Sequence, residues 1–195
     1  MSNFYTETEL KTLGMRLLYE SHKKKGGGRP LVSRKASIYG AEHISIGSNV
    51  RIDDFCILSG NITVGNNVHI AAYTALYGGK DGIVIEDYAN LSSRVSVYSV
   101  NDDYSGETMT NPMIPEEYKN IESAAVYIGK HVIVGSTSVI LPGIRLAEGS
   151  AFGSFSFINH DSEPWSVNAG IPFRKIRDRK KDILKLEKQF ETGIN

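Results

Sequence analysis

The chain has 195 residues, which is enough for one large domain with a substantial core, and its composition is that of an ordinary globular protein. Lysine and arginine together number 22, as do aspartate and glutamate, so no net positive charge favours binding to nucleic acid or to an anionic membrane. No apolar run approaches the length of a membrane span and the first residues are too polar for a signal peptide, so we expect a cytoplasmic protein.

Residues 1–30 are predicted to form a helix and a linker that precede the main domain. Thr6-Glu7-Thr8-Glu9 has the spacing of a capping box, and three leucines then recur at helical spacing, which predicts a helix over 6–21. The run of lysines and glycines at 23–28 ends this helix and is predicted to be a linker.

A repeat of six residues begins near Val32. Apolar residues recur at every sixth position in two series that are offset from each other by two residues. The series are Val32, Ile38, Ile44, Val50, Cys56, Ile62 and Val68, and Ile46, Ile52, Leu58, Val64, Ile70 and Leu76. A period of six fits neither a helix nor a simple alternating strand. It is typical of a parallel β-helix, in which six residues supply one short strand and one turn and three such units close a coil. We therefore expect an all-β core.

The repeat is interrupted in two places. Three extra residues separate Leu76 from Ile85, and the glycines at 77–82 predict a small bulge or loop at a corner of the β-helix. The second interruption, at 99–125, is much longer and shows no period of six. Loops of this length are uncommon in compact domains and tend to be functional, so we expect this one to contribute to a site.

The most regular part of the repeat follows this loop. Its inward positions are Ile128, Val134, Ile140, Leu146, Phe152 and Ile158, and a small residue follows most of them. Together the repeats predict a β-helix domain of about seven coils over 31–172, with the loop at 99–125 inserted. Residues 173–195 are predicted to form a C-terminal helix, in which 177–190 is amphipathic.

This pattern resembles the hexapeptide-repeat acyltransferases over 32–174, and 128–174 is most similar to the galactoside and maltose acetyltransferase branch. The resemblance implies a left-handed parallel β-helix and a homotrimer in which acetyl-CoA lies in the groove between neighbouring subunits. Two stretches resemble more closely the sugar O- and N-acetyltransferases of surface-polysaccharide pathways such as O-antigen synthesis. Some of those enzymes acetylate a nucleotide-linked amino sugar such as dTDP-4-amino-4,6-dideoxyglucose. The stretches are Asp102-Asp103-Tyr104-Ser105-Gly106 with Thr110-Asn111-Pro112, and Pro164-Trp165 with Ala169-Gly170-Ile171-Pro172.

The resemblance also implies a set of cofactor contacts. In that branch a Gly-Ser corner lies beside the pantetheine, a small residue one coil later meets a cofactor amide, and a basic residue follows a Gly-x-Pro motif. A Thr-Lys pair of the branch is replaced here by Asn159-His160. An extended pantetheine chain can bond exposed corner backbone almost as an added strand, and basic side chains can meet the phosphates. The expected cofactor-binding residues are Gly135, Ser136, Ser154, Asn159, His160, Arg174 and Lys175.

The general base of the branch is missing from this sequence. The branch uses a histidine directly after a coil, and that position falls on Asp102 here, with no histidine between His69 and His131. Either a carboxylate of Asp102 or Asp103 does this work, or His69 reaches the site, or little base is needed. The expected substrate-binding residues are Asn101, Tyr104, Ser92 and Arg94.

The missing histidine bears on the reaction. A sugar hydroxyl needs a base whose pKa is near the working pH, and an ordinary aspartate, with a pKa of about 4, is a weak one. An amine with a pKa on the order of 8 is already partly neutral, so a carboxylate need only hold and orient it. This favours N-acetylation of an amino sugar, while burial of the aspartate would raise its pKa and allow O-acetylation.

Two other classes of function fit the sequence less well. A β-helix zinc enzyme of the carbonic anhydrase type needs three histidines that converge, whereas the five histidines here are scattered, so we expect no metal. A non-catalytic scaffold would keep the repeat but would have no use for the loop at 99–125, or for Gly135-Ser136 together with Arg174. The sequence therefore predicts an acetyl-CoA-dependent sugar N-acetyltransferase, with an O-acetyltransferase and a non-catalytic scaffold as alternatives.

Overall fold

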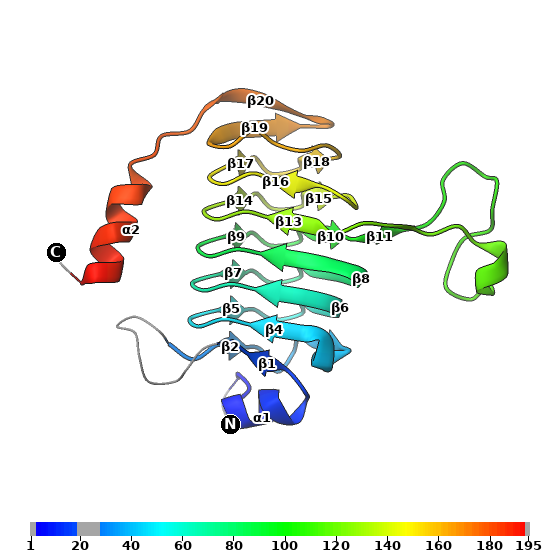
Figure 1. Cartoon of the computed structure of the whole chain (residues 1–195), viewed down its shortest axis with the longest axis horizontal. Coiled ribbons are helices and arrows are strands. Elements are labelled where there is room, and N and C mark those ends of the chain that lie inside the picture. Colours follow the sequence, from blue (N-terminus) through cyan, green and yellow to red (C-terminus); the bar gives the residue numbers. More distant parts are fainter. Residues whose placement is uncertain (1–2, 19–27, 194–195) are drawn as a thin grey trace.

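The structure, a computed structural model, describes residues 3–18 and 28–193, and these form a parallel β-helix (Figure 1). Each coil contributes short strands to three faces of a prism, and the strands of successive coils pair in parallel. The parallel β-helix predicted from the period of six is confirmed. The residues at 23–27 of the predicted linker lie outside the described part of the chain.

The three faces are defined by which strands pair. The first face contains β1 (Arg16–Leu17), β4 (Ile44–Ile46), the second halves of β6 (Ile57–Val64) and β8 (Ala75–Ile85), β13 (Val126–Ile128) and β16 (Arg145–Leu146). The second face contains β3 (Ser37–Tyr39), the first halves of β6 and β8, β10 (Ser96–Tyr98), β15 (Val139–Ile140) and β18 (Phe157–Ile158). The third face contains β2 (Leu31–Val32), β5 (Arg51–Ile52), β7 (His69–Ile70), β9 (Asn90–Leu91), β14 (Ile133–Val134), β17 (Ala151–Phe152) and β19 (Ser166–Gly170).

The core fills the inside of the prism. Every residue of the series from Ile46 to Leu76, and every inward position from Ile128 to Ile158, is buried. Register pairs such as Ile70 with Leu91 stack the large side chains of one coil on those of the next. Burial of an aliphatic side chain stabilises the fold by about 1.5–3 kcal/mol, so the stacked coils support one another. Phe173 covers one end of the core, where its ring lies edge-on to Phe152 with 5.1 Å between ring centroids.

Three corners join the faces: an arm corner, a helix corner beside which the C-terminal helix lies (Figure 1), and a serine corner that contains Ser92, Ser93, Ser136 and Ser154. The arm corner joins the second face to the first and carries the insertion at 99–125, called the arm. The helix corner joins the first face to the third, and its tip residues with positive φ include Asn49, Asn67, Tyr88 and His131. The serine corner joins the third face to the second, and its tip residues with positive φ are Phe55, Tyr73, Arg94, Thr137 and Phe155.

The N-terminal helix is shorter than predicted. α1 (Glu7–Thr12) begins with the predicted capping box, in which the Thr6 hydroxyl and the Glu9 carboxylate each accept from the other's backbone N–H. The helix ends before Gly14, which has a φ of 99°, and Arg16–Leu17 then pair with β4 as strand β1. The prediction of a helix over 6–21 is therefore wrong for residues 13–18, because the chain joins the first face of the prism there, and residues 19–21 lie outside the described part of the chain.

The C-terminal helix also begins later than predicted. β20 (Phe173–Asp178) pairs antiparallel with β19, so the start of the predicted helix is strand, and α2 (Ile183–Thr192) follows. α2 lies beside the helix corner (Figure 1), where Glu187 bonds to Lys130 and to His131. Within the described residues, neither helix is long and apolar enough to cross a membrane.

Both predicted interruptions occur at the arm corner. Residues 77–82 form a bulge within β8, where the register with β6 shifts next to Gly60. The arm leaves the prism through β11 (Val100–Asn101) and returns through β12 (Glu122–Ser123), which pair antiparallel. Beyond this strand pair the arm contains a short 3-10 helix (Glu116–Tyr118) and extends far from the prism (Figure 1). A second 3-10 helix (Ala41–His43) precedes β4.

Candidate active site

Asp102 lies at the base of the arm. It follows β11 directly, where Asn101 pairs with Glu122 across the two-stranded ladder. Its side chain is partly exposed, and it forms no hydrogen bond or ion pair with any residue of the described part of the chain. The carboxylate is therefore free to hold a cationic group of a ligand.

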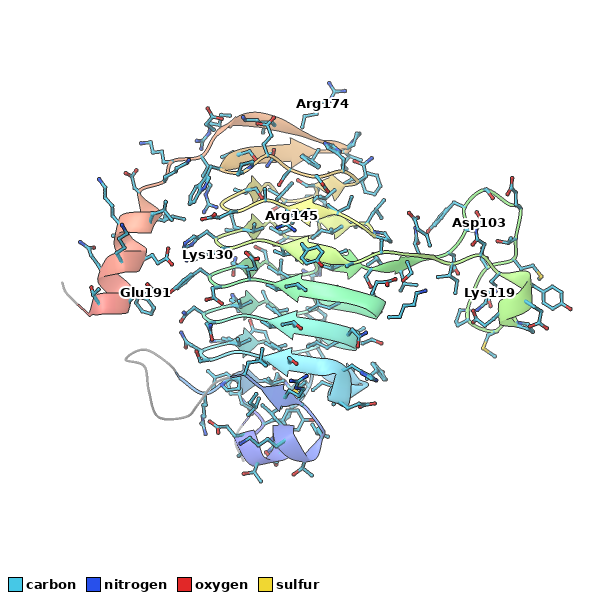
Figure 2. The ribbon with its side chains drawn as sticks, viewed as in Figure 1. Asp103, Lys119, Lys130, Arg145, Arg174 and Glu191 are labelled. Carbon is cyan, nitrogen blue, oxygen red and sulfur yellow. The ribbon has the colours of Figure 1, made fainter. Side chains whose placement is uncertain are left out.

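The carboxylate of Asp103, the neighbouring candidate, is hydrogen-bonded to other residues of the arm. Its carboxylate accepts hydrogen bonds from the backbone N–H and hydroxyl of Ser105 (2.8 and 3.0 Å) and of Thr108 (3.2 and 2.7 Å). These bonds, led by the Thr108 hydroxyl, lower the pKa of Asp103 to about 2. Figure 2 shows Asp103 out in the arm, away from the prism. A carboxylate committed to four donors is a poor base, so the geometry favours Asp102 over Asp103.

His69 lies on the outer side of the third face with both ring nitrogens engaged. Its Nε2 lies 2.8 Å from Asp53 Oδ2, and its Nδ1 lies 3.0 Å from Asn90 Oδ1. Burial alone would raise the pKa of Asp53, but hydrogen bonds from His69 and Arg51 bring it below its usual value. The imidazole would have to leave one of these partners before it could take a proton from a substrate. Asp53 and Asn90 were not singled out in the sequence, although both occupy the same part of the stacked coils as His69.

The serine corner brings together the first group of expected cofactor contacts. A side chain on Gly135 would place a Cβ 2.4 Å from the backbone nitrogen of Ser154, so only glycine fits this close approach of two coils. The Ser136 hydroxyl lies 3.4 Å from that of Ser93, and Ser154 is exposed. The corner therefore presents accessible polar backbone and hydroxyl groups along the axis of the prism, as an extended amide chain requires.

Two expected substrate contacts also lie at the serine corner. The backbone N–H of Ser92 donates to the carbonyl of Val134 in the next coil, so Ser92 neighbours the cofactor corner. The Arg94 guanidinium lies 5.2 Å from the centre of the Tyr73 ring, a cation–π arrangement that keeps its charge at the surface. The other two, Asn101 and Tyr104, belong to the arm instead, and Tyr104 is largely exposed.

A cavity of about 450 Å³ at the end of the prism is lined by three more of the expected cofactor contacts, His160, Arg174 and Lys175. The His160 ring stacks on Phe173 with 4.0 Å between centroids, and its Nδ1 lies 3.0 Å from Asn159 Oδ1. Arg174 lines this cavity and points away from the prism (Figure 2), and its side chain pairs with no residue in the described ranges. Lys175 is paired with Asp178 (2.8 Å) and Glu163 (2.7 Å), which raise its pKa.

The candidate residues thus fall into separate groups on one chain. Asp102 belongs to the arm corner, whereas Gly135, Ser136 and Ser154 belong to the serine corner, and the whole second face separates the two corners. Among residues 3–18 and 28–193, no three histidine, cysteine or carboxylate side chains are placed to hold a metal ion.

Comparison with known proteins shows what this arrangement is similar to. The family model described as "Bacterial transferase hexapeptide (six repeats)" matches residues 43–78. The chain is 47% identical over 193 residues to a dTDP-4-amino-4,6-dideoxy-D-glucose acyltransferase of Escherichia coli, which covers 97% of this chain and 96% of that one. It is 27% identical over 194 residues to the galactoside O-acetyltransferase of Escherichia coli (strain K12), and the match covers 95% of this chain and 89% of that one.

Solved structures of AntD, an N-acyltransferase from Bacillus cereus, match the whole chain. The complex with dTDP and 3-hydroxybutyryl-CoA has a TM-score of 0.91 at 47% identity, and 100% of both chains is covered. A variant of AntD in complex with dTDP-4-amino-4,6-dideoxyglucose and coenzyme A has a TM-score of 0.92 at 46% identity, again over 100% of both chains.

Proposed function

The chain belongs to the hexapeptide-repeat acyltransferases, and we propose that it transfers an acetyl group from acetyl-CoA to the amino group of a nucleotide-linked amino sugar such as dTDP-4-amino-4,6-dideoxyglucose. The similarity to an acyltransferase named for this sugar, and to AntD structures that contain it, supports the choice of acceptor. The motifs shared with surface-polysaccharide acetyltransferases lead us to propose that the product is used for O-antigen or a related polysaccharide.

We propose an amine rather than a hydroxyl as the acyl acceptor because the Asp102 carboxylate has no hydrogen-bond or ion-pair partner among the described residues. An ammonium group at Asp102 would be held by a charge-assisted hydrogen bond until it loses its proton, and the neutral amine would then attack the thioester carbonyl. The proton that the ammonium loses passes to the Asp102 carboxylate or to water. The carbon–nitrogen bond then forms and the carbon–sulfur bond breaks. The second proton, lost by the attacking nitrogen, is taken up by the departing sulfur, so coenzyme A leaves as the thiol. The serine and the aspartate that are replaced in the AntD variants are ten residues apart, as are Ser92 and Asp102 here and also Ser93 and Asp103, so the spacing supports a serine–aspartate pair in this stretch. The hydrogen bonds that Asp103 accepts from Ser105 and Thr108 favour Asp102 as its aspartate.

The separation of the two corners supports a site built by two chains. Asp102 and the serine corner lie on opposite edges of the second face, so one groove can hold both only if the arm comes from a neighbouring copy. Closed rotational symmetry is the common way to repeat such a heterologous contact, and we propose the homotrimer that is typical of the family. A chain that sediments as a monomer at micromolar concentration would contradict this assembly.

An acceptor panel tests the proposed reaction. We expect thiol release from acetyl-CoA with dTDP-4-amino-4,6-dideoxyglucose and no release above background with dTDP-glucose, which offers only hydroxyls. Comparable rates with both acceptors would establish the O-acetyltransferase alternative, and absence of acetyl-CoA binding by calorimetry would establish the scaffold. A strong preference for 3-hydroxybutyryl-CoA over acetyl-CoA would show that the proposed acyl group is too short.

Arg174 provides a prediction for the cofactor end of the site. Arg174→Ala should raise the KM for acetyl-CoA about tenfold with little change in kcat, because a phosphate contact remote from the reacting atoms is made equally in the ground and transition states. Lys175→Ala is the matched control. Its ammonium is already neutralised by Glu163 and Asp178, so we expect a smaller change in KM. An unchanged KM in Arg174→Ala, measured by initial rates, would contradict this placement.

A further inference from the structure

The bulge at 77–82 and the arm at 99–125 are physically joined, although 42 residues separate their contact points in sequence. The Ser123 hydroxyl donates a hydrogen bond to Asp81 Oδ2, which links the bulge to β12 at the base of the arm. Ser123 is itself paired with Val100 of β11. One bond from Asp81 therefore restrains both strands of the base, and Asp102 follows the first of these strands directly.

The backbone of the bulge also meets the start of the arm. A Cβ on Gly79 would lie 3.3 Å from Val100 Cβ and 3.4 Å from the Ser99 hydroxyl, so the two segments are already in close contact. Gly79 has a φ of 48°, a left-handed conformation that glycine adopts without strain. The Ser99 side chain is buried, and its hydroxyl donates to the carbonyl of Tyr77 at 3.1 Å.

The bulge has a structural purpose that the regular repeat does not meet. A corner of regular length, without the three extra residues, would not make these contacts with β11 and β12 where the two strands leave the prism. The three extra residues carry the preceding coil outward, so that it touches the start of the arm at Ser99 and Val100 and its return at Ser123. Asp102 lies two positions after Val100, roughly 7 Å along an extended chain, so the direction of β11 fixes the position of the carboxylate.

We propose that Asp81 is a positioning residue that orients Asp102 for the transfer reaction through Ser123 and the β11–β12 pair. The inference rests on the proposed function, because it needs Asp102 to act on the acceptor. It adds a role for the bulge, which belongs to neither the cofactor contacts nor the acceptor contacts. A misplacement of about 1 Å at a reacting group is enough to cost roughly a hundredfold in rate, so even a small loss of restraint at the base should be measurable.

A double-mutant cycle with Asp102 tests the proposal. Asp81→Ala removes the carboxylate that accepts the hydrogen bond from Ser123. It should lower kcat/KM for the amino sugar about tenfold while the KM for acetyl-CoA stays unchanged. Ser123→Ala removes the donor of the same bond and should reproduce this loss. Asp81→Asn keeps an oxygen that can accept from Ser123 and should restore activity to within about twofold of the wild type. In an Asp102→Asn background, Asp81→Ala should cost less than about twofold, because no carboxylate is left to place.

The outcomes that overturn the proposal are distinct. Equal losses from Asp81→Ala with and without the Asp102 carboxylate would show that Asp81 acts elsewhere, while the role of Asp102 would stand. No loss in either Asp81→Ala or Ser123→Ala would show that the bond positions nothing. If Asp102→Asn alone has no effect, the proposed function of the arm fails as well, and that single measurement separates this failure from the others. If Asp81→Ala loses acetyl-CoA binding, the bulge itself has been disturbed. Ser123→Ala, which leaves the bulge unchanged, then shows by its kcat/KM for the amino sugar whether the bond positions Asp102.

Discussion

Replacement of Asp102 by asparagine is expected to lower kcat/KM for the amino-sugar acceptor by about tenfold to a thousandfold, the scale of losing one oriented charge or general base. Asparagine keeps the shape of the side chain but can neither attract an ammonium group strongly nor take its proton. The fold should be unaffected, because Asp102 bonds to nothing else in the parts of the chain that the structure describes. Initial rates at varied acceptor concentration, with acetyl-CoA saturating, measure the effect.

His69→Ala is the informative control for this prediction. The His69 ring is held by Asp53 and Asn90 on the third face, so its removal should cost less than the change at Asp102. For an amine acceptor, activity should still rise toward mildly alkaline pH without His69, because the neutral fraction of the amine grows. The reverse order, with His69→Ala nearly inactive and Asp102→Asn mild, would make His69 the base and would favour a hydroxyl acceptor.

The fold was accessible from sequence because its rule is local. Each unit of six places one large residue inward, and outside the interruptions at 77–82 and 99–125 the same rule holds from Ile46 to Ile158 without reference to distant parts of the chain. The N-terminal segment does not follow that rule. Leucines at helical spacing predicted a helix to residue 21, but Leu17 pairs with Ile46 in the first face and the chain turns at Gly14. Edge pairing with an existing sheet outweighs a weak helical preference, and this is a tertiary effect.

The candidate site was only partly accessible from sequence. Asp102 and Asp103 are adjacent carboxylates, and which of them is free depends on a turn in which Ser105 and Thr108 bond to one and not the other. The Asp-x-Ser spacing of an Asx turn was a signal for this that could have been used. The bond between Asp81 and Ser123 had no such signal, because the distance between them in sequence is set by the length of an inserted arm.

The second large effect that we expect follows from the proposed assembly of the site, and it is the recovery of activity when two impaired variants are mixed. Ser154→Trp should block the exposed serine corner of its own chain, while Asp102→Asn disables the arm of its own chain. In the proposed homotrimer, either variant alone has a defect in every site. In trimers mixed at equal amounts, a site that takes its arm from one chain and its serine corner from the neighbour has both intact parts about one time in four. We therefore expect about a quarter of the wild-type rate from the mixture.

A matched mixture shows whether the arm and the serine corner come from different chains. When wild-type chains are mixed equally with chains that carry both substitutions, a site built by two chains again retains about a quarter of the activity, whereas a site within one chain retains about half. A site within one chain would also give no recovery when the two single variants are mixed. Native mass spectrometry confirms that the chains have exchanged before rates are compared. Recovery near a quarter in both mixtures is the result expected from the prism, since its second face separates Asp102 from Ser136 and Ser154 in every single chain.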